Sequence, residues 1–258
     1  MENIKKFDQK ATIYSKFRPD YPDALINDMI SDHNLNHHSI IADIGSGTGI
    51  LTKKLLDSHF KVFAVEPNAK MREVAEEKLK NNKNFISVNG AAEYTSLDTG
   101  SVDFITTAQA FHWFDHKMFK KECQRMLKPF GKVMIISNER LKEAAINQEI
   151  IKIYTKFCPE FRGFSNGLSE SEEIYDKFFF NGAYITNSYH FPLTYNQSSF
   201  VGRHLSASYA PKKEDKHYSM IIEALHNLFE KYCQNGYVTL PNVTISRCGF
   251  VKDNSFCQ

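Results

Sequence analysis

The sequence lacks the features that mark membrane-spanning and exported chains. No run of 18 apolar residues occurs in the 258 residues, so we expect no transmembrane helix and no membrane partner. The first ten residues are polar and contain no apolar core of a signal peptide. The five cysteines form no Cys-x-x-Cys pair, which supports neither a disulfide framework nor a zinc knuckle. A reducing, cytoplasmic location fits this cysteine usage best.

The chain also lacks an excess of charge of one sign. It has 32 basic and 30 acidic residues, a formal net charge of +2. Proteins that bind nucleic acid usually present a basic face, so we expect no nucleic-acid partner. The ten histidines include no His-Glu-x-x-His pattern, and we expect no metal. Hydrophobic residues make up 42% of the chain, enough to build a core and to argue against disorder.

Residues 39–137 alternate short apolar runs with amphipathic segments. This alternation predicts a parallel sheet with helices on both faces. The strands are expected at residues 39–44, 61–65, 85–88, 102–107 and 132–137. The helices are expected at residues 23–32, with Asp23 as the cap, and at 50–58, 69–80 and 117–127.

The second half of the chain has a different pattern. Residues 139–180 are expected to be mainly helical, and residues 183–195 form a strand that Pro192 interrupts. Two helices, at 198–208 and 215–234, then precede a last pair of strands around the Pro241-Asn242 turn. We expect these helices to cap the sheet and not to form an independent domain.

The strongest local signal is the segment Asp43-Ile44-Gly45-Ser46-Gly47-Thr48-Gly49, between an apolar strand and an amphipathic helix. Glycines let the chain turn sharply and let a ligand approach the backbone, and the helix N-terminus supplies free N–H groups. The spacing differs from the Gly-x-Gly-x-x-Gly fingerprint of dinucleotide sites. A carboxylate at Asp43 disfavours a pyrophosphate but suits a ligand that carries an ammonium and a sulfonium.

Glu66 stands at the end of the second predicted strand. A carboxylate at this place can accept hydrogen bonds from both hydroxyls of a ribose. NAD and S-adenosylmethionine (SAM) both carry a free 2′-hydroxyl, so Glu66 does not separate them. The spacing of the glycines does, and it argues against an NAD-dependent oxidoreductase.

Several segments together resemble class I SAM-dependent methyltransferases. Residues 43–49 look like the first motif of that family, and Val65-Glu66-Pro67-Asn68 with Met71 looks like the second. Further resemblances lie in Asn89-Gly90-Ala91-Ala92-Glu93, in Ser101-Val102-Asp103-Phe104, in residues 108–114, and in Leu127-Lys128-Pro129-Phe130-Gly131, where Phe130 replaces a glycine. The resemblance covers about residues 10–137.

The N-terminal segment Tyr14-x-x-x-Arg18-Pro19-x-Tyr21-Pro22 resembles the small-molecule branch of the family that includes trans-aconitate methyltransferase. The resemblance implies that Tyr14 lies near the methionine moiety and Arg18 near its carboxylate, which an arginine fork suits. The alternative is that both side chains merely pack against a helix end.

The resemblance implies SAM as cofactor and S-adenosylhomocysteine as product. The residues expected at the cofactor are Tyr14, Arg18, Asp43, Gly45, Ser46, Gly47, Thr48, Gly49, Glu66, Pro67, Met71, Ala91, Ala92, Glu93, Gln109 and Ala110. Ala91 and Ala92 are small enough to admit the adenine ring. Glu93 either binds the exocyclic amine or caps a turn, and both readings stay open.

The segment Phe111-His112-Trp113-Phe114-Asp115 contains the only tryptophan and should face the transferred methyl group. Aromatic faces attract a sulfonium as they attract other cations. His112 and Tyr14 are the candidate catalytic residues, with His112 as a general base for an acidic acceptor. The alternative is an aromatic cluster in the core with a hydrogen-bonded histidine.

Arg203, Ser206 and Tyr209 are the candidates for holding the acceptor, together with Trp113. At helical spacing Arg203 and Ser206 share a face, where they would hold an anionic group. Ordinary helix surface is the alternative. No Asn/Asp-Pro-Pro-Tyr segment and no Pro-Cys pair after the fourth strand occurs, so we do not expect a nucleic-acid substrate.

We therefore expect an α/β fold with a Rossmann-like, doubly wound, mostly parallel seven-stranded sheet, helices on both faces and a helical cap. Its parts are an N-terminal helical lid (1–38), a SAM-binding core (39–138), and cap insertions with the last strands (139–258). The expected function is methyl transfer to a carboxylate or hydroxyl oxygen of a small molecule by a monomer or homodimer. The alternative is a catalytically silent SAM-binding or partner-binding protein on the same fold.

Overall fold

Seven strands form one sheet in the part of the chain that the computed structural model describes, residues 18–164, 172–207 and 209–253. Their order is β3-β2-β1-β4-β5-β9-β6. The first five strands are parallel, and β9 runs antiparallel to both β5 and β6. The strands are β1 (Ile40–Ile44), β2 (Lys61–Val65), β3 (Phe85–Val88), β4 (Val102–Ala108), β5 (Leu127–Arg140), β6 (Tyr184–His190) and β9 (Asn242–Gly249). This sheet confirms the expected fold class.

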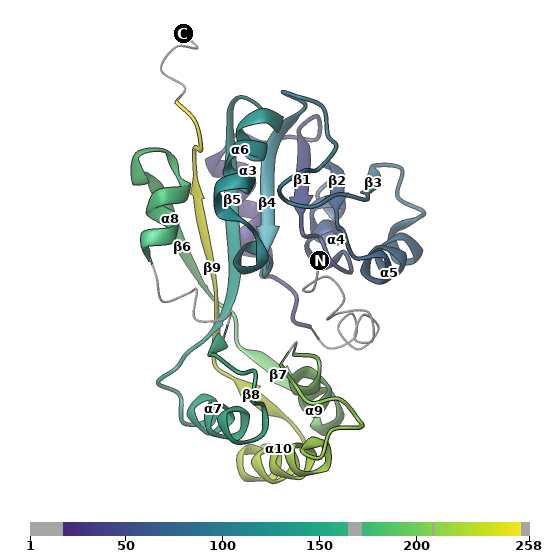
Figure 1. Cartoon of the computed structure of the whole chain (residues 1–258), viewed down its shortest axis with the longest axis vertical. Helices are drawn as coiled ribbons and strands as arrows, with labels where there is room; N and C mark the ends of the chain where they lie inside the picture. Colours follow the sequence, from purple (N-terminus) through teal and green to yellow (C-terminus); the bar gives the residue numbers. More distant parts are fainter. Residues whose placement is uncertain (1–17, 165–171, 208, 254–258) are drawn as a thin grey trace.

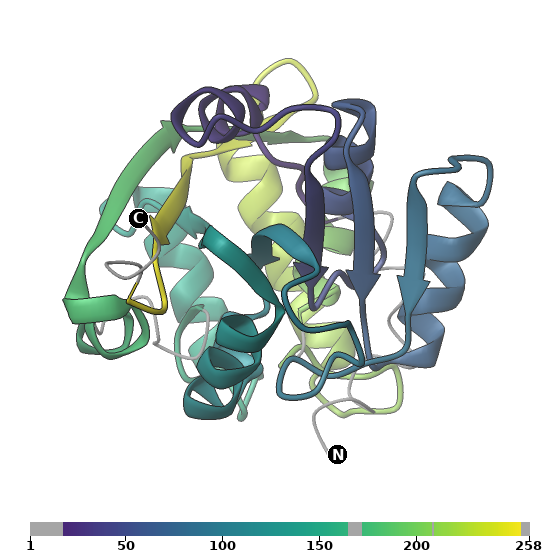
Figure 2. The same ribbon diagram turned by 90° about the horizontal axis from the view of Figure 1, so that it is seen from above.

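Helices cover both faces of the sheet, as Figure 2 shows from above. Successive strand residues point to opposite faces, so Ile41 packs with α3 and α4, whereas its neighbour Ala42 packs with α6 and α8. The two apolar cores on either side of the sheet hold it in place. The helices are α3 (Asp23–Asp32), α4 (Ile50–Asp57), α5 (Ala69–Leu79), α6 (His116–Met126) and α8 (Glu172–Phe178), with the short 3-10 helices η1 (Phe111–Trp113) and η3 (Phe180–Gly182).

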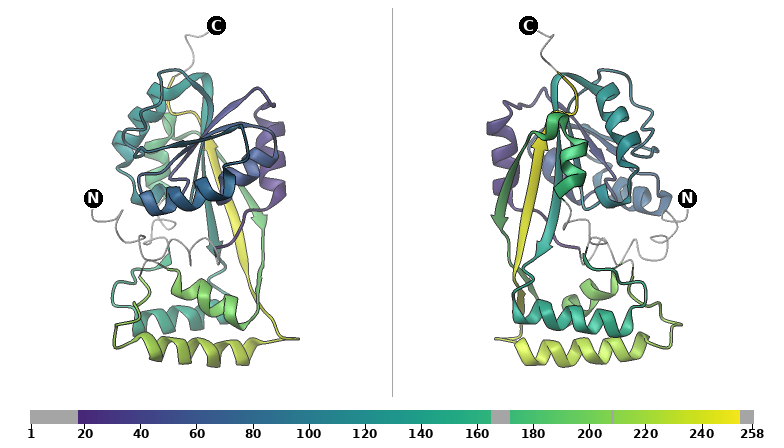
Figure 3. Two further views of the ribbon diagram at one scale, coloured as in Figure 1. Left: turned by 90° about the vertical axis from the view of Figure 1, so that its right-hand side faces the viewer. Right: turned by 60° about the vertical axis from the view of Figure 1, so that its left-hand side comes forward.

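A second body of structure lies beyond the carboxyl end of β4 (Figures 1 and 3). It has its own apolar core, in which Ile150, Tyr154, Phe200 and Leu225 are fully buried. The long strands β5, β9 and β6 lead into it. We call this body the cap; its elements are α7 (Ala145–Phe157), β7 (Leu193–Tyr195), α9 (Gln197–Leu205), α10 (Tyr218–Tyr232) and β8 (Val238–Leu240). The cap therefore faces the sheet edge at which the glycine-rich segment lies.

Several local predictions were wrong. Pro22 precedes α3 as its cap, and Asp23 is the first helical residue. The strand expected at 132–137 extends over Leu127–Arg140, because the chain passes the Pro129-Phe130-Gly131 turn with Phe130 at a φ of 62° and stays in the ladder. A turn signal bends a strand there instead of ending it.

The last two strands do not pair with each other. Strand β8 pairs with β7 in a separate two-stranded sheet, and β9 pairs with β5 and β6. Pro241 stands where the chain passes from the cap into the main sheet. The strand expected at 183–195 is divided in the same way, into β6 of the main sheet and β7 of the cap. Strand pairing here follows the burial of two separate cores, which local sequence does not show.

Candidate functional site

The glycine loop, residues 45–49, connects β1 to α4. Gly45, Gly47 and Gly49 have φ values of 69°, 57° and 78°, a region that other residues enter only at a cost. A Cβ at Gly45 would lie 2.6 Å from the Cβ of Ala110. The Gly45 N–H donates to the carbonyl of Val65 at 2.9 Å. The loop is therefore packed tightly against the ends of β2 and β4.

Asp43 lies at the end of β1 and is almost fully buried. Its two carboxylate oxygens accept hydrogen bonds from Thr52 Oγ1 at 2.6 Å and Thr106 Oγ1 at 3.1 Å. Burial raises the pKa of Asp43 to about 6, although both threonine hydrogen bonds act in the opposite direction. The carboxyl group is thus half-ionised near pH 6, and a cation bound beside it would favour the charged form.

Glu66 follows β2 and is fixed against the glycine loop. Its Oε2 accepts a hydrogen bond from the Gly47 N–H at 2.9 Å, and its Oε1 accepts one from the Asn68 N–H at 2.8 Å. Burial raises the pKa of this carboxyl, and the two backbone N–H groups counteract the shift. Each oxygen keeps a second accepting position. The geometry therefore presents a fixed acceptor pair at the edge of the loop.

Pro67 and Met71 complete this edge. The Asn68 side chain caps α5 by accepting from the Met71 N–H at 2.9 Å, as expected for asparagine before a helix. The Met71 sulfur is buried and would lie 3.7 Å from a Cβ placed at Gly47. The carbonyl of Pro67 accepts a hydrogen bond from Arg72 Nη1 at 3.1 Å. Met71 thus lies directly beside the loop, whereas Pro67 shapes the turn that follows β2.

The segment after β3 is held by its own backbone. Ala91 and Tyr94 exchange two backbone hydrogen bonds of 3.1 Å. Ala92 is buried in the core. Glu93 Oε1 accepts a hydrogen bond from the Asp115 N–H at 2.8 Å. Of the two readings left open for Glu93, this bond favours the one in which it caps a turn.

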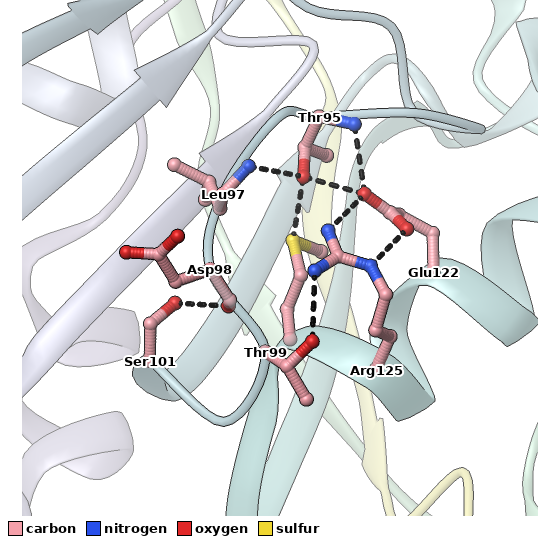
Figure 4. A network of polar contacts seen from close by, with 8 residues as sticks. Thr95, Leu97, Asp98, Thr99, Ser101, Glu122 and Arg125 are labelled. Carbon is pink, nitrogen blue, oxygen red and sulfur yellow. Dashed lines mark hydrogen bonds and ion pairs between the residues drawn. The ribbon is translucent and has the colours of Figure 1, made fainter.

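A polar network that the sequence analysis missed anchors this segment from below (Figure 4). Buried Glu122 accepts hydrogen bonds from the N–H of Thr95 at 2.8 Å and from its Oγ1 at 2.7 Å. The guanidinium of Arg125 donates to both oxygens of Glu122, at 2.8 and 2.7 Å. Burial alone would raise the pKa of Glu122, but the bonds from Arg125 and Thr95 lower it to about 2. The Glu122–Arg125 spacing on a helix was the available signal.

The segment after β4 is divided between the core and the site. Phe111 is buried; its ring stacks on His116 with centroids 4.4 Å apart and meets Phe178 edge to face at 5.0 Å. His112 and Trp113 are only partly buried, and their ring centroids lie 4.8 Å apart. Phe111 therefore belongs to the aromatic core, whereas the place of His112 and Trp113 beside the transferred methyl group stays a prediction.

Gln109 and Ala110 join β4 to this segment. Gln109 has a φ of 56°, and its Nε2 donates to the carbonyl of Asn138 at 3.1 Å. Ala110 is buried under Gly45. A pocket opens between the loop and the end of β4; its lining residues are Tyr21, Asp43, Gly45, Ser46, Gly47, Thr48, Ile50, Leu51 and Ala108. The hydroxyl of Thr48 is buried there without a hydrogen-bond partner.

His112 is held in its neutral form. Burial, together with the charges of Arg18 and His116, lowers its pKa to about 4. A neutral imidazole can accept a hydrogen bond at physiological pH. Its low pKa, however, makes it a weak proton acceptor.

Arg18 connects the site to the cap. Its Nη2 donates to the carbonyl of Ser206 at 3.4 Å, and its charge acts on both His112 and Arg203. Arg18 therefore lies between the segment after β4 and α9. Tyr14, the other residue predicted in the N-terminal lid, lies outside the described residues.

The three predicted cap residues lie at the end of α9 and just beyond it. Arg203 is in α9, and the hydroxyl of Ser206 donates to the carbonyl of Arg203 at 2.7 Å. This bond closes the end of the helix, and the joint binding of an anionic group by Arg203 and Ser206 stays a prediction. The Tyr209 ring lies against Tyr154, with centroids 5.0 Å apart. Arg140, at the end of β5, lies near Arg203 and Tyr209 and was not predicted.

Neither a metal site nor a membrane-spanning helix occurs within the described ranges. There, no group of three or more His, Cys, Asp or Glu side chains is arranged to hold a metal ion. No helix of that part is long and apolar enough to cross a membrane.

Comparison with known proteins agrees with this geometry. Residues 42–135 match the model of a methyltransferase domain. An uncharacterized methyltransferase-like protein of Schizosaccharomyces pombe is 32% identical over 163 residues, which cover 62% of each chain. A second protein of that yeast, an uncharacterized methyltransferase, is 34% identical over 128 residues, 49% of this chain and 50% of the relative. The chain thus spans about half to three fifths of the length of these relatives.

The fold is shared with a solved structure from Anaeromyxobacter dehalogenans described as a "Putative Type II Methyltransferase". The TM-score is 0.65 at 21% identity, covering 91% of this chain and 98% of the other. The matched segment, 42–135, contains the glycine loop, Glu66 and the residues after β3 and β4. Residues 42–135 therefore match a methyltransferase domain, and the described part of the chain shares the fold of that solved structure.

Proposed function

We propose that the protein transfers a methyl group from SAM to a small-molecule acceptor. The observation that carries the proposal is the Glu66 carboxylate, which the N–H groups of Gly47 and Asn68 hold beside the glycine loop. A rigid acceptor pair at this place suits the two hydroxyls of a ribose. The preordered backbone means that little reorganisation is needed when the nucleoside binds.

The remaining residues of the loop fit the rest of the donor molecule. The backbone is bare at Gly45 and Gly47, and the Thr48 hydroxyl is buried without a partner. Asp43 supports the binding of a cationic group, since a nearby positive charge would offset the cost of ionising a buried carboxyl. These residues would hold SAM.

SAM supplies an electrophilic methyl group: the acceptor's lone pair forms the new bond to carbon as the carbon–sulfur electrons return to sulfur. The residues of this chain then have three tasks, which are to orient the acceptor, to exclude water and to remove a proton if the acceptor carries one. The cap and residues 111–113 cover the strand ends. Because His112 is a weak base, the site favours an acceptor that is already ionised, such as a carboxylate.

The proposed setting follows from composition. The near balance of charge supports a small molecule over a nucleic acid as acceptor. No disulfide joins the four cysteines of the described ranges to one another, which supports a reducing, cytoplasmic location.

Ligand-dependent unfolding tests the cofactor. S-adenosylhomocysteine or SAM should stabilise the folded protein by about 3 kcal/mol when the ligand is present at a hundred times its Kd, and the melting temperature should rise accordingly. NAD and NADP should leave the melting temperature unchanged. Stabilisation by NAD and none by SAM would overturn the proposal. Methyl transfer itself is measured as S-adenosylhomocysteine formed in the presence of small acids, phenols or amines. A protein that binds SAM and forms no product with any of them is the silent alternative.

A further inference from the structure

Two partly buried arginines beside the core of the cap have no carboxylate partner among the described residues. Arg140 ends β5, and Arg203 lies in α9. Among the described residues, none with a carboxylate forms an ion pair with either guanidinium. Burying a charge without a partner is costly, so an arrangement of this kind requires an explanation.

Hydroxyl groups surround the two arginines. Tyr209 lies within hydrogen-bonding reach of Arg140, and Tyr154 and Tyr195 lie close to both arginines. The Tyr154 ring packs 5.0 Å from that of Tyr209. We call Arg140, Arg203 and these three tyrosines the cap cluster.

Polar atoms of this cluster are left without partners. They are Nη2 of Arg140, Nε of Arg203, and the hydroxyls of Tyr154 and Tyr195, all of them buried. Native structures pair nearly all of their buried polar groups. Four such groups around one place, all able to donate a hydrogen bond, match a ligand that only accepts.

The electrostatic cost of the cluster falls on Arg203, whereas the neighbouring tyrosines offset burial at Arg140 and raise the pKa of that guanidinium. Burial lowers the pKa of Arg203 to about 10, and the charges of Arg18 and Arg140 act in the same direction. The face of Phe164 lies 4.2 Å from the Arg140 guanidinium and compensates only part of its lost hydration. A bound anion would relieve this repulsion and satisfy the open donors together.

We propose that the cap cluster binds a small organic anion with at least two negative charges, and that this anion is the methyl acceptor. The inference rests on the proposed function for the identity of the reaction, but not for the binding itself. Arg140 and Arg203 hold one charged end of the molecule, because guanidinium groups pair with carboxylates and phosphates through parallel hydrogen bonds. Arg140 is thereby assigned as a specificity-determining residue.

The position of Arg18 gives the bound anion a direction. Arg18 contacts Ser206 at the end of α9 and acts on His112 after β4. A molecule anchored at Arg203 therefore extends past Arg18 toward the segment that borders the donor site. Its second ionised group would then lie beside the donor site. Because that group is already deprotonated, it can accept the methyl group without a base.

Binding of simple anions tests the cluster without turnover. Succinate, citrate and inorganic phosphate are each titrated into the protein by calorimetry and thermal unfolding, at ionic strength held constant with sodium chloride. At least one of them should bind and raise the melting temperature, and uncharged dimethyl succinate should not. Arg140→Gln should weaken the binding at least tenfold and leave the stabilisation by S-adenosylhomocysteine intact.

Arg162→Gln is the matched control, since Arg162 is in an exposed loop near the cap and donates to the Pro159 carbonyl. This variant should bind the anion like the wild type. The proposal is overturned if none of the three anions binds, or if Arg140→Gln binds them as the wild type does. If Arg140→Gln fails to fold, Arg203→Gln replaces it in the same titrations and should also bind the anion at least tenfold more weakly. Equal binding of succinate and dimethyl succinate by the wild type would likewise overturn the proposal. Stabilisation by S-adenosylhomocysteine without any anion effect overturns this inference alone, whereas its absence overturns the proposed function.

Discussion

At the scale of single residues, two buried carboxylates define the proposed donor site, and they differ in how the fold holds them. Glu66 is held by backbone N–H groups, and Asp43 by threonine hydroxyls. Backbone donors are fixed, so Glu66 is the more rigid of the two. A substitution at Glu66 should therefore test ligand binding with less effect on folding stability than one at Asp43.

Glu66→Ala should weaken the binding of S-adenosylhomocysteine by about 1–3 kcal/mol, because hydrogen bonds to a charged acceptor are lost. Calorimetry measures the change. Glu73→Ala, on the exposed side of α5, is the control and should bind normally. Unchanged affinity in Glu66→Ala would show that other residues hold the ribose.

Asp43 should make the stability of the unliganded protein depend on pH. Its pKa is raised to about 6 from 3.8, so the folded state binds the proton more tightly than the unfolded chain does. This contribution is complete below pH 3.8 and is lost as the pH rises through 6. Relative to the wild type, Asp43→Asn should therefore gain about 1–3 kcal/mol between pH 4 and pH 7. Thermal unfolding curves that keep a constant difference across this range would contradict the assignment.

At the scale of elements, the segment after β3 depends on a helix that lies under it. Glu122 in α6 binds the backbone and hydroxyl of Thr95, and Arg125 fixes its carboxylate. The segment that contains Ala91 and Ala92 is therefore positioned by a helix that packs in the same core as Ala92. Losing this support should therefore lower the free energy of unfolding more than it lowers the rate of methyl transfer.

Glu122→Gln should lower the free energy of unfolding at pH 7 by about 1–3 kcal/mol, since charged hydrogen bonds are lost in a buried place. The pKa of Glu122 is lowered to about 2, so its contribution is present above its ordinary value near 4.5 and disappears as the pH falls toward 2. The difference between variant and wild type, measured by urea unfolding, should therefore shrink on acidification. Glu77→Gln, in an exposed pair with Lys80, should cost less than about 1 kcal/mol. Equal costs for both variants would contradict the proposed anchoring.

At the scale of the whole molecule, the cap has a core of its own and reaches the sheet through β5, β6 and β9. Hydrogen exchange should show this division, because cooperative units open separately. S-adenosylhomocysteine should slow exchange in residues 43–49 and 66–71. Helices α7 and α10, which lie within the cap, should exchange at unchanged rates. Equal protection of α10 would mean that the donor site and the cap open as one unit.

The sequence alone determined the order and type of the elements in the first half of the chain. Strands β2 and β3 have the predicted bounds, because their apolar runs end at strong turn signals such as Glu66-Pro67-Asn68. The glycine loop was equally readable, since positive φ angles restrict residue choice strongly. Donor-site residues that follow such signals were therefore predictable by position, and their roles remain predictions.

Only the tertiary structure decided how the second half is divided. Phe191-Pro192 and Pro241 look like ordinary turns, yet each marks the passage between the main sheet and the cap. Arg140 is the last residue of a strand that sequence reasoning ended at residue 137, and it meets Arg203 only after the chain has folded back over the strand ends. Contacts between residues far apart in sequence depend on which surfaces pack against each other. A local sequence pattern does not specify that packing.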